Sequence, residues 1–214
     1  MSSARDRILG TLRTGLRGTR VPPLPDAVAS AGVVPGERAE KFAAVLAKIG
    51  GRVDRVRGLA AAAARVREVL LAAGAKRVAL SDAPELAAFV GAWPPTLRSL
   101  SHDAPRDELL AADAGVTFAQ HGIAETGTLV LTSAHEQNRL ASLLPALHVA
   151  VLPGSRLCGT LADAFAALQG VDGSPIARTI TFVTGPSRTA DIELTLVVGV
   201  HGPKTLHVVL VDDA

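Results

Sequence analysis

A nine-residue segment, Gly185–Glu193, combines residue types that bind small anions. Its first glycine permits a tight turn, and Ser187 or Thr189 can cap a helical turn whose free backbone N–H groups attract an anion. Arg188 can add a bidentate guanidinium clamp for a carboxylate or a phosphate. The same residues also suit a simple capping turn, with Arg188 and Asp191 as a solvent-exposed ion pair. The segment therefore predicts either the rim of an anion site or an ordinary turn.

A second segment, Gly122–Thr128, carries one carboxylate between two glycines. That carboxylate, Glu125, follows an expected strand at 116–120, where it can act at a cleft mouth as nucleophile, general base or hydrogen-bond acceptor. An exposed turn residue is the alternative interpretation. We take Glu125 as the candidate catalytic residue. The candidate ligand-binding residues are Thr126, Gly127, Thr128, Arg139, Gly185, Pro186, Ser187, Arg188, Thr189, Asp191 and His201.

Arg139 and His201 each have two interpretations. Arg139 stands at an expected helix start, where it can reach a ligand anion or form a surface ion pair. His201 can carry a proton or donate to a ligand, but its neighbours Gly202 and Pro203 also suit an ordinary turn. If the last three strands form an antiparallel meander, His201 lies at the end of the sheet opposite Ser187.

The histidines and the single cysteine do not predict a metal site. His121, His135 and His148 lack a ligand spacing such as H-x-x-x-H. His148 starts an expected strand between apolar neighbours, so we expect a structural histidine with its hydrogen bonds satisfied. Cys158 is expected to be a small buried residue, and one cysteine cannot hold a Cys-ligated zinc or iron–sulfur site. We therefore predict that this chain alone binds no cofactor.

Helices and strands alternate through most of the chain, which predicts an α/β domain. Apolar periodicity predicts a helix at 37–49, a strand at 52–56, and a helix at 59–73 with Gly74 as its C′ residue. A buried strand is predicted at 179–183, so the anion motif begins where a strand ends, as ligand sites of open α/β sheets do. The other expected strands are 77–80, 116–120, 129–132, 148–152, 194–200 and 206–211, and the other expected helices are 84–90, 105–112, 139–144 and 157–168.

The spacing of the last strands predicts a mixed sheet. About ten residues separate Val183 from Leu194, which is close to the shortest parallel crossover that includes a helix. An antiparallel connection is therefore favoured.

The N-terminal residues 1–35 are expected to form an arm outside the α/β domain, which spans 36–214. Apolar residues recur at helical spacing across 3–16 and predict a short amphipathic helix. The proline-rich run at 21–25 then forces an extended linker, because proline fixes φ and pushes its predecessor out of the α region.

Composition narrows the function classes. The net charge is only +2, its basic residues are scattered, and aromatic residues make up 3% of the chain, so nucleic acid is not an expected partner. No apolar run approaches the ~20 residues that cross a bilayer, and the N-terminus lacks the order of a signal peptide. We expect no membrane insertion and a cytoplasmic location.

Taken together, these segments resemble the LUD domain family, and most closely its lactate utilisation protein C branch. A single segment would be a weak signal, whereas four segments in the right order are specific. The resemblance covers about residues 37–213 and is carried by Gly122–Thr128, Arg139 with Ser142–Pro145, Gly185–Glu193, and Gly199–Pro203.

The resemblance implies a Rossmann-like, three-layer α/β fold similar to that of the isomerases and CoA-transferases. It also implies a part in the oxidation of L-lactate to pyruvate beside iron–sulfur subunits, with this chain as a non-redox component that binds a small carboxylate or phosphate. The Glu125 turn resembles, more faintly, the glutamate loop of CoA-transferases, although Thr126 stands where that loop has an amide side chain. Two alternatives stay open: a self-sufficient acyl-CoA or phosphosugar enzyme that uses Glu125, and a structural adaptor.

Overall fold

The computed structural model of the 214-residue chain describes residues 3–19, 32–91, 93–134, 139–168, 177–189 and 197–213. The chain forms two compact units, Met1–Ala31 and Gly32–Ala214. The expectations for His135, for Asp191 and for the first part of the strand at 194–200 lie outside the described residues.

The first unit contains α1 (Ala4–Gly15), which confirms the helix expected at 3–16. Ser3 caps it, because its hydroxyl oxygen accepts the Asp6 backbone N–H at 3.2 Å. The Asp6 carboxylate in turn accepts the Ser3 backbone N–H at 3.2 Å. This reciprocal capping box satisfies two N–H groups that the first turn of a helix leaves unpaired, and it explains why the helix begins at Ala4.

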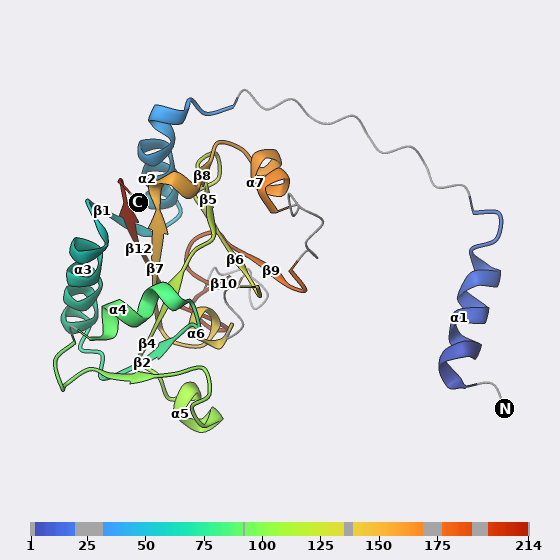
Figure 1. The fold of residues 1–214 in the computed structure, drawn as a ribbon, viewed down its shortest axis with the longest axis horizontal. Coiled ribbons are helices and arrows are strands. Elements are labelled where there is room, and N and C mark those ends of the chain that lie inside the picture. Colours follow the sequence, from blue (N-terminus) through green and yellow to red (C-terminus); the bar gives the residue numbers. More distant parts are fainter. Residues whose placement is uncertain are drawn as a thin grey trace. The chain divides into compact units, whose positions relative to one another are not determined.

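The second unit is an α/β domain built on a six-stranded central sheet (Figure 1). Every described strand pairing in that sheet is parallel. Its order is β1 (Arg52–Val56), β12 (Thr205–Val211), β7 (Leu147–Pro153), β4 (Ala114–Phe118), β2 (Arg77–Leu80) and β3 (Arg98–Leu100). Each residue of β4 and β7 is buried, the pattern of parallel strands that are covered on both faces.

A second, four-stranded sheet contains the mixed pairing. Its order is β8 (Leu157–Cys158), β5 (His121–Ile123), β6 (Thr128–Thr132) and β9 (Ile180–Val183). β6 pairs antiparallel with both β5 and β9, whereas β5 and β8 are parallel. A separate short ladder joins β10 (Arg188–Thr189) to β11 (Val197–Val198).

The expected antiparallel meander of the last strands is wrong. β9 pairs with β6 in the second sheet, and β12 lies between β1 and β7 in the central sheet, parallel to both. The prediction was wrong because it relied on connection length alone and assumed that strands close in sequence share one sheet. The strand at 179–183 is also not buried: Phe182 is 37% exposed and contacts Phe165 with ring centroids 5.7 Å apart.

Helices cover both faces of the central sheet. α3 (Leu59–Ala72) and α4 (Ala87–Val90) contribute apolar side chains to the core on one face, beside Val149 and Val209. α2 (Arg38–Lys48) packs with the second sheet against the other face, where Phe42 and Leu46 are fully buried. α5 (Arg106–Leu110) and α6 (Leu140–Leu143) share a smaller core with β2 on that side, and α7 (Leu161–Leu168) packs on β5 and β8 (Figure 1).

Local signals explain where two helices start and stop. α3 ends as predicted, because Gly74 has a φ of +68° and a backbone hydrogen bond to Leu71, while Ala75 bonds back to Leu70. The helix expected at 157–168 begins only at Leu161. Thr160 and Asp163 cap it reciprocally, and Leu157 and Cys158 form β8 instead. The short strands β3, β5, β8 and β10 were not predicted, because two or three residues are too few to show a period.

The packing of α6 on β4 depends on Gly115. A Cβ atom at this position would lie 1.7 Å from the backbone oxygen of Ala141 in α6. α6 carries Ser142 and Leu143, so the absence of a side chain on β4 determines how closely these two residues approach the sheet.

We predict that Gly115→Ala lowers the free energy of unfolding by about 1 to 3 kcal/mol, because the helix backbone must move to admit the methyl group. Denaturant unfolding measures the change. Gly91→Ala is the matched control, because a Cβ atom there meets nothing within 4 Å, and its stability should stay near that of the wild type. Equal stability of the two variants would contradict the close approach of α6 to β4.

Candidate functional site

A cavity of about 200 Å³ opens between β9, α6 and the starts of β7 and β12. Its polar lining includes Ser142, His148, Ser187 and His201, and its walls include the 184–187 and 201–203 turns. No carboxylate belongs to the described residues that line it. Three of the predicted ligand-binding residues, Gly185, Ser187 and His201, therefore share one cavity.

The expectation that His201 lies at the opposite end of the sheet from Ser187 is wrong. Two backbone hydrogen bonds join their turns: the Ser187 N–H donates to the Pro203 carbonyl at 2.9 Å, and the Gly199 N–H donates to the Ser187 carbonyl at 2.8 Å. Both residues line the same cavity because β10 and β11 form a ladder of their own, away from the central sheet.

His148 differs most from its expected role. Its imidazole is fully buried and its Nε2 lies 2.8 Å from the Thr117 hydroxyl, but its Nδ1 has no hydrogen-bond partner among the described residues. Burial lowers the pKa of His148 to about 4, so the ring is neutral near pH 7. Sequence reasoning treated His148 as a satisfied structural histidine. Because His148 lines the cavity and its buried Nδ1 has no partner among the described residues, it is a candidate ligand-binding residue.

The Glu125 turn lies next to this cavity rather than in it. The Glu125 N–H donates to the Gly159 carbonyl at 3.1 Å, and the Glu125 residue is exposed to solvent. A chain of hydroxyl groups connects the turn to the cavity wall: Thr126 and Thr128 are 2.7 Å apart, and Thr128 and Thr184 are 2.8 Å apart. Thr184 lines the cavity, so the carboxylate is a neighbour of the site and not one of its lining groups.

Gly127 holds the same turn against α2. Its φ is +64°, and a Cβ atom there would lie 2.7 Å from the Leu46 backbone nitrogen. The glycine is therefore required both for the turn and for its close approach to the helix.

The structure places the predicted arginines outside the lining of the cavity. The Arg188 guanidinium donates to the backbone carbonyl of Ile49 at the end of α2, where a cation favourably meets the helix dipole. Pro186 lies on the same side, near Gly50, and Thr189 pairs with Val197 in the β10–β11 ladder. Arg139 is exposed just before α6.

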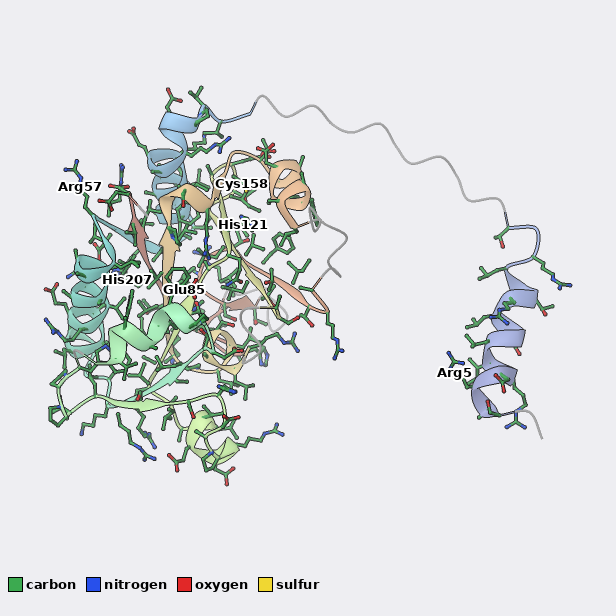
Figure 2. All side chains as sticks on the ribbon, viewed as in Figure 1. Arg5, Arg57, Glu85, His121, Cys158 and His207 are labelled. Carbon is green, nitrogen blue, oxygen red and sulfur yellow. The ribbon has the colours of Figure 1, made fainter. Side chains whose placement is uncertain are left out.

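Cys158 occupies the buried position expected of it. Its Sγ lies 3.9 Å from His121 Nδ1, and the two residues come from the paired strands β8 and β5 of the second sheet (Figure 2). Burial raises the pKa of the Cys158 thiol, which keeps it protonated near neutral pH. Within the described ranges, no three His, Cys, Asp or Glu side chains gather in a way that could hold a metal ion.

The family model of the LUD domain matches residues 39–211. The chain belongs to the LUD domain family.

Curated relatives named Lactate utilization protein C match part of this LUD domain. The protein from Bacillus licheniformis is 43% identical over 104 residues, which cover 48% of this chain and 43% of that protein. The protein from Geobacillus kaustophilus is 39% identical over 123 residues, which cover 56% of this chain and 50% of that protein. The matched part thus spans about half the length of these relatives.

A solved structure shares the fold. A DUF162 family protein from Deinococcus radiodurans aligns with a TM-score of 0.60 at 23% identity and covers 84% of this chain and 99% of that chain. Both proteins therefore have the same mixed α/β architecture. Along the described part of the LUD chain, no helix combines the length and apolar character needed to cross a membrane.

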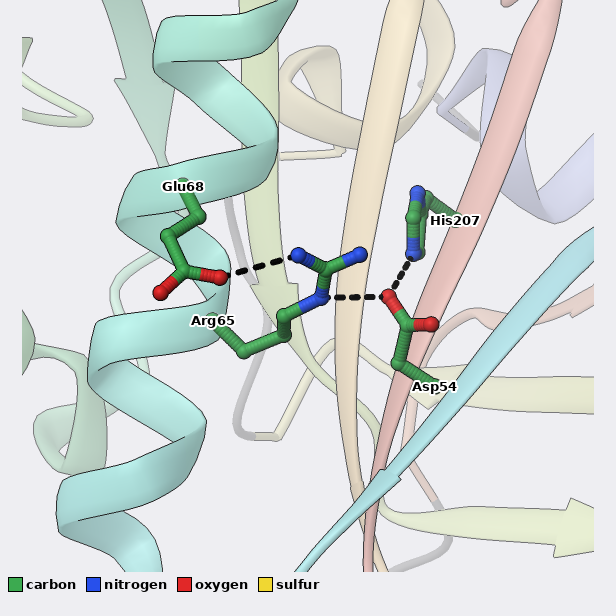
Figure 3. A network of polar contacts seen from close by, with 4 residues as sticks. All are labelled: Asp54, Arg65, Glu68 and His207. Atoms are coloured by element: carbon green, nitrogen blue, oxygen red, sulfur yellow. Dashed lines mark hydrogen bonds and ion pairs between the residues drawn. The ribbon is translucent and has the colours of Figure 1, made fainter.

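A polar network that sequence reasoning missed lies on the α3 face of the LUD domain (Figure 3). Asp54 of β1 accepts hydrogen bonds from Arg65 of α3 at 2.7 Å and from His207 of β12 at 2.5 Å. Arg65 also pairs with Glu68 at 2.9 Å. Burial opposes ionisation of Asp54, but these hydrogen bonds outweigh it and lower its pKa. No local motif could reveal the network, because it joins residues more than 150 positions apart.

Arg65, Glu68 and His207 also line a second cavity of about 280 Å³. The charges of this network largely pair with one another, so we interpret it as a clamp between α3 and the edge of the central sheet.

The pKa of His148 makes stability depend on pH. The unfolded ring has a pKa of about 6.5 and the folded ring of about 4, so the unfolded state binds the extra proton between these values. The contribution of the neutral His148 ring to the free energy of unfolding is fully present above about pH 6.5 and is lost as the pH falls toward 4. The total loss is on the order of 3 kcal/mol.

Urea unfolding of wild type and His148→Gln between pH 7 and pH 4 measures this effect, and the variant should show a shallower loss. Histidine NMR titration of the wild type provides a readout that does not depend on the variant's folding. A His148 ring that titrates near pH 6.5 in the folded protein would contradict its burial.

Proposed function

We propose that this chain takes part in lactate utilisation as a non-redox component that binds a small hydroxy-acid anion in the His148 cavity. The names of the curated relatives support the first part of the proposal. The unpaired Nδ1 of His148, in a cavity that also carries Ser187 and His201, is the observation that supports the second.

The chemistry of the cavity suits such a ligand. Its volume of about 200 Å³ is below the ~300 Å³ at which pockets for drug-sized ligands begin, so it matches a ligand of few atoms. The Ser187 hydroxyl and the His201 ring offer hydrogen bonds to a carboxylate, and a neutral His148 can pair with the ligand hydroxyl. The absence of carboxylates from the described lining avoids repulsion of the anion.

The electrons removed from lactate need an acceptor outside this chain. Oxidation of lactate to pyruvate removes two electrons and two protons, and a single cysteine cannot ligate an iron–sulfur cluster in this chain. We therefore propose iron–sulfur subunits as partners that accept the electrons, with this chain as the ligand-binding component.

The finer fold proposal is a Rossmann-like domain of the isomerase and CoA-transferase type. The parallel central sheet with helices on both faces supports it. One observation also favours an acyl-CoA enzyme as the second candidate: Glu125 is exposed on a turn whose backbone is hydrogen-bonded to Gly159 and to Ile123. A carboxylate so displayed can attack a thioester.

We predict that Ser187→Ala and His201→Gln each weaken L-lactate binding about tenfold, the loss expected when one hydrogen bond to an anion is removed. Isothermal titration calorimetry measures the affinities. Arg188→Ala is the matched control from the same ladder and should stay within about twofold of wild type, because its guanidinium binds the Ile49 carbonyl. Unchanged affinity of Ser187→Ala and His201→Gln would remove the cavity from the binding role.

The subunit role predicts that the purified chain alone does not oxidise L-lactate and that activity appears when iron–sulfur proteins encoded beside it are added. Electron transfer to an artificial acceptor is the readout. Oxidation by the isolated chain would contradict the proposal. Acyl-CoA turnover that is lost in a folded Glu125→Gln variant would support the second candidate. Full reconstituted activity in the Ser187→Ala and His201→Gln variants would instead indicate a structural adaptor.

A further inference from the structure

A third cavity, of about 300 Å³, lies at the carboxyl ends of β1, β7 and β12. Three arginines line it: Arg55 and Arg57 at the end of β1, and Arg38 in the first turn of α2. Asp212 is the acidic residue in the described lining. Figure 2 shows Arg57 beyond the end of β1, beside the central sheet. The carboxyl ends of parallel strands are where open α/β sheets bind ligands.

The lining keeps an excess of positive charge. Arg55 is paired with Asp212 at 2.9 Å, so this aspartate neutralises one arginine. Arg38 donates to the neutral backbone carbonyl of Leu157 at 2.9 Å and keeps its charge. Arg57 is exposed and forms no ion pair with any described residue. Two guanidinium charges are therefore left without a matching acid in the lining.

Three further acids lie close by. Asp213 accepts the Gly58 N–H and Asp163 accepts the Thr160 N–H, and the Asp163 carboxylate also interacts electrostatically with Arg38. Glu37 is exposed between Gly36 and Arg38 but does not belong to the lining. These three acids lower the positive electrostatic potential around the cavity, but they do not line it.

Backbone groups support anion binding at the same place. α2 starts at Arg38 without a side-chain cap, and Gly36 and Ala39 of this helix start line the cavity. The Glu37 and Arg38 N–H groups already donate to the carbonyls of Val34 and Pro35 in the 3-10 turn that leads into α2, so the helix start favours an anion through its dipole. Gly154 follows β7, and a Cβ atom added at this position would lie 3.0 Å from the Val211 carbonyl oxygen. The absence of a side chain therefore lets the ends of β7 and β12 approach each other beside the cavity.

We propose that this cavity binds the phosphate group of a phosphorylated small organic molecule, at a site separate from the His148 cavity. Guanidinium forks match phosphate oxygens bidentately, and two guanidinium groups without an acidic partner in the lining suit the dianion of a phosphate monoester better than a single carboxylate. The site does not depend on the proposed binding of lactate.

Calorimetric titration of the full chain with inorganic phosphate, ADP and L-lactate tests the site. ADP should bind with measurable affinity and more tightly than inorganic phosphate. Arg57→Gln should weaken ADP binding at least fivefold, and Arg57→Lys should recover part of it, because lysine keeps the charge but loses the fork. L-lactate affinity should be the same in both variants and in wild type.

Arg106→Gln is the matched control, because it removes the same charge from an exposed position on α5. It should change ADP affinity less than twofold. Three results would each overturn the proposal: no saturable binding of ADP, equal weakening by Arg57→Gln and Arg106→Gln, or binding of inorganic phosphate without ADP. Because Arg57 is exposed, circular dichroism of the variant should match the wild type and confirm that the fold is intact.

Discussion

The burial of β7 and β12 on both faces is the constraint on which the rest of the domain depends. All seven residues of β7 are buried, as are all those of β12 except its first, Thr205. No water reaches these backbones, so their N–H and carbonyl groups must pair with neighbouring strands. β12 therefore lies between β1 and β7, and β7 lies between β12 and β4. The segments that carry the candidate site are positioned relative to this pair of strands.

The same pair of strands gives two histidines opposite environments. His148 is the register partner of Leu206, and His207 is the partner of Val149, so the two imidazoles start from adjacent positions on opposite faces. On the α3 face, His207 meets Asp54 and becomes part of a charge-paired clamp. On the other face, the His148 imidazole contacts the neutral Thr117 hydroxyl, and its Nδ1 has no hydrogen-bond partner among the described residues. Burial keeps this ring uncharged. Polar partners, not residue type, decide which histidine is structural and which is available to a ligand.

The two proposed sites lie at opposite ends of β7. His148 is the second residue of that strand, and Gly154 follows its last residue. Seven extended residues span about 20 Å, so one small hydroxy acid cannot reach both cavities. A neutral, hydroxyl-rich cavity at one end and an arginine-lined cavity at the other therefore suit two different ligands, and each can be tested without the other.

The sequence by itself determined the elements whose signals are local: the helix at 59–73 with its Gly74 cap, the buried runs of β7 and β12, and the turns around Glu125 and Ser187. Only the tertiary structure decided which of these segments meet. In the tertiary structure, β9 belongs to a second sheet, His201 and Ser187 line the same cavity, and Arg188 donates to the Ile49 carbonyl. The tertiary structure also assembled the arginine cavity from residues at 38, 55 and 57. The physical reason is that periodicity and capping report interactions within a few residues, whereas strand pairing and cavity lining depend on contacts between distant segments.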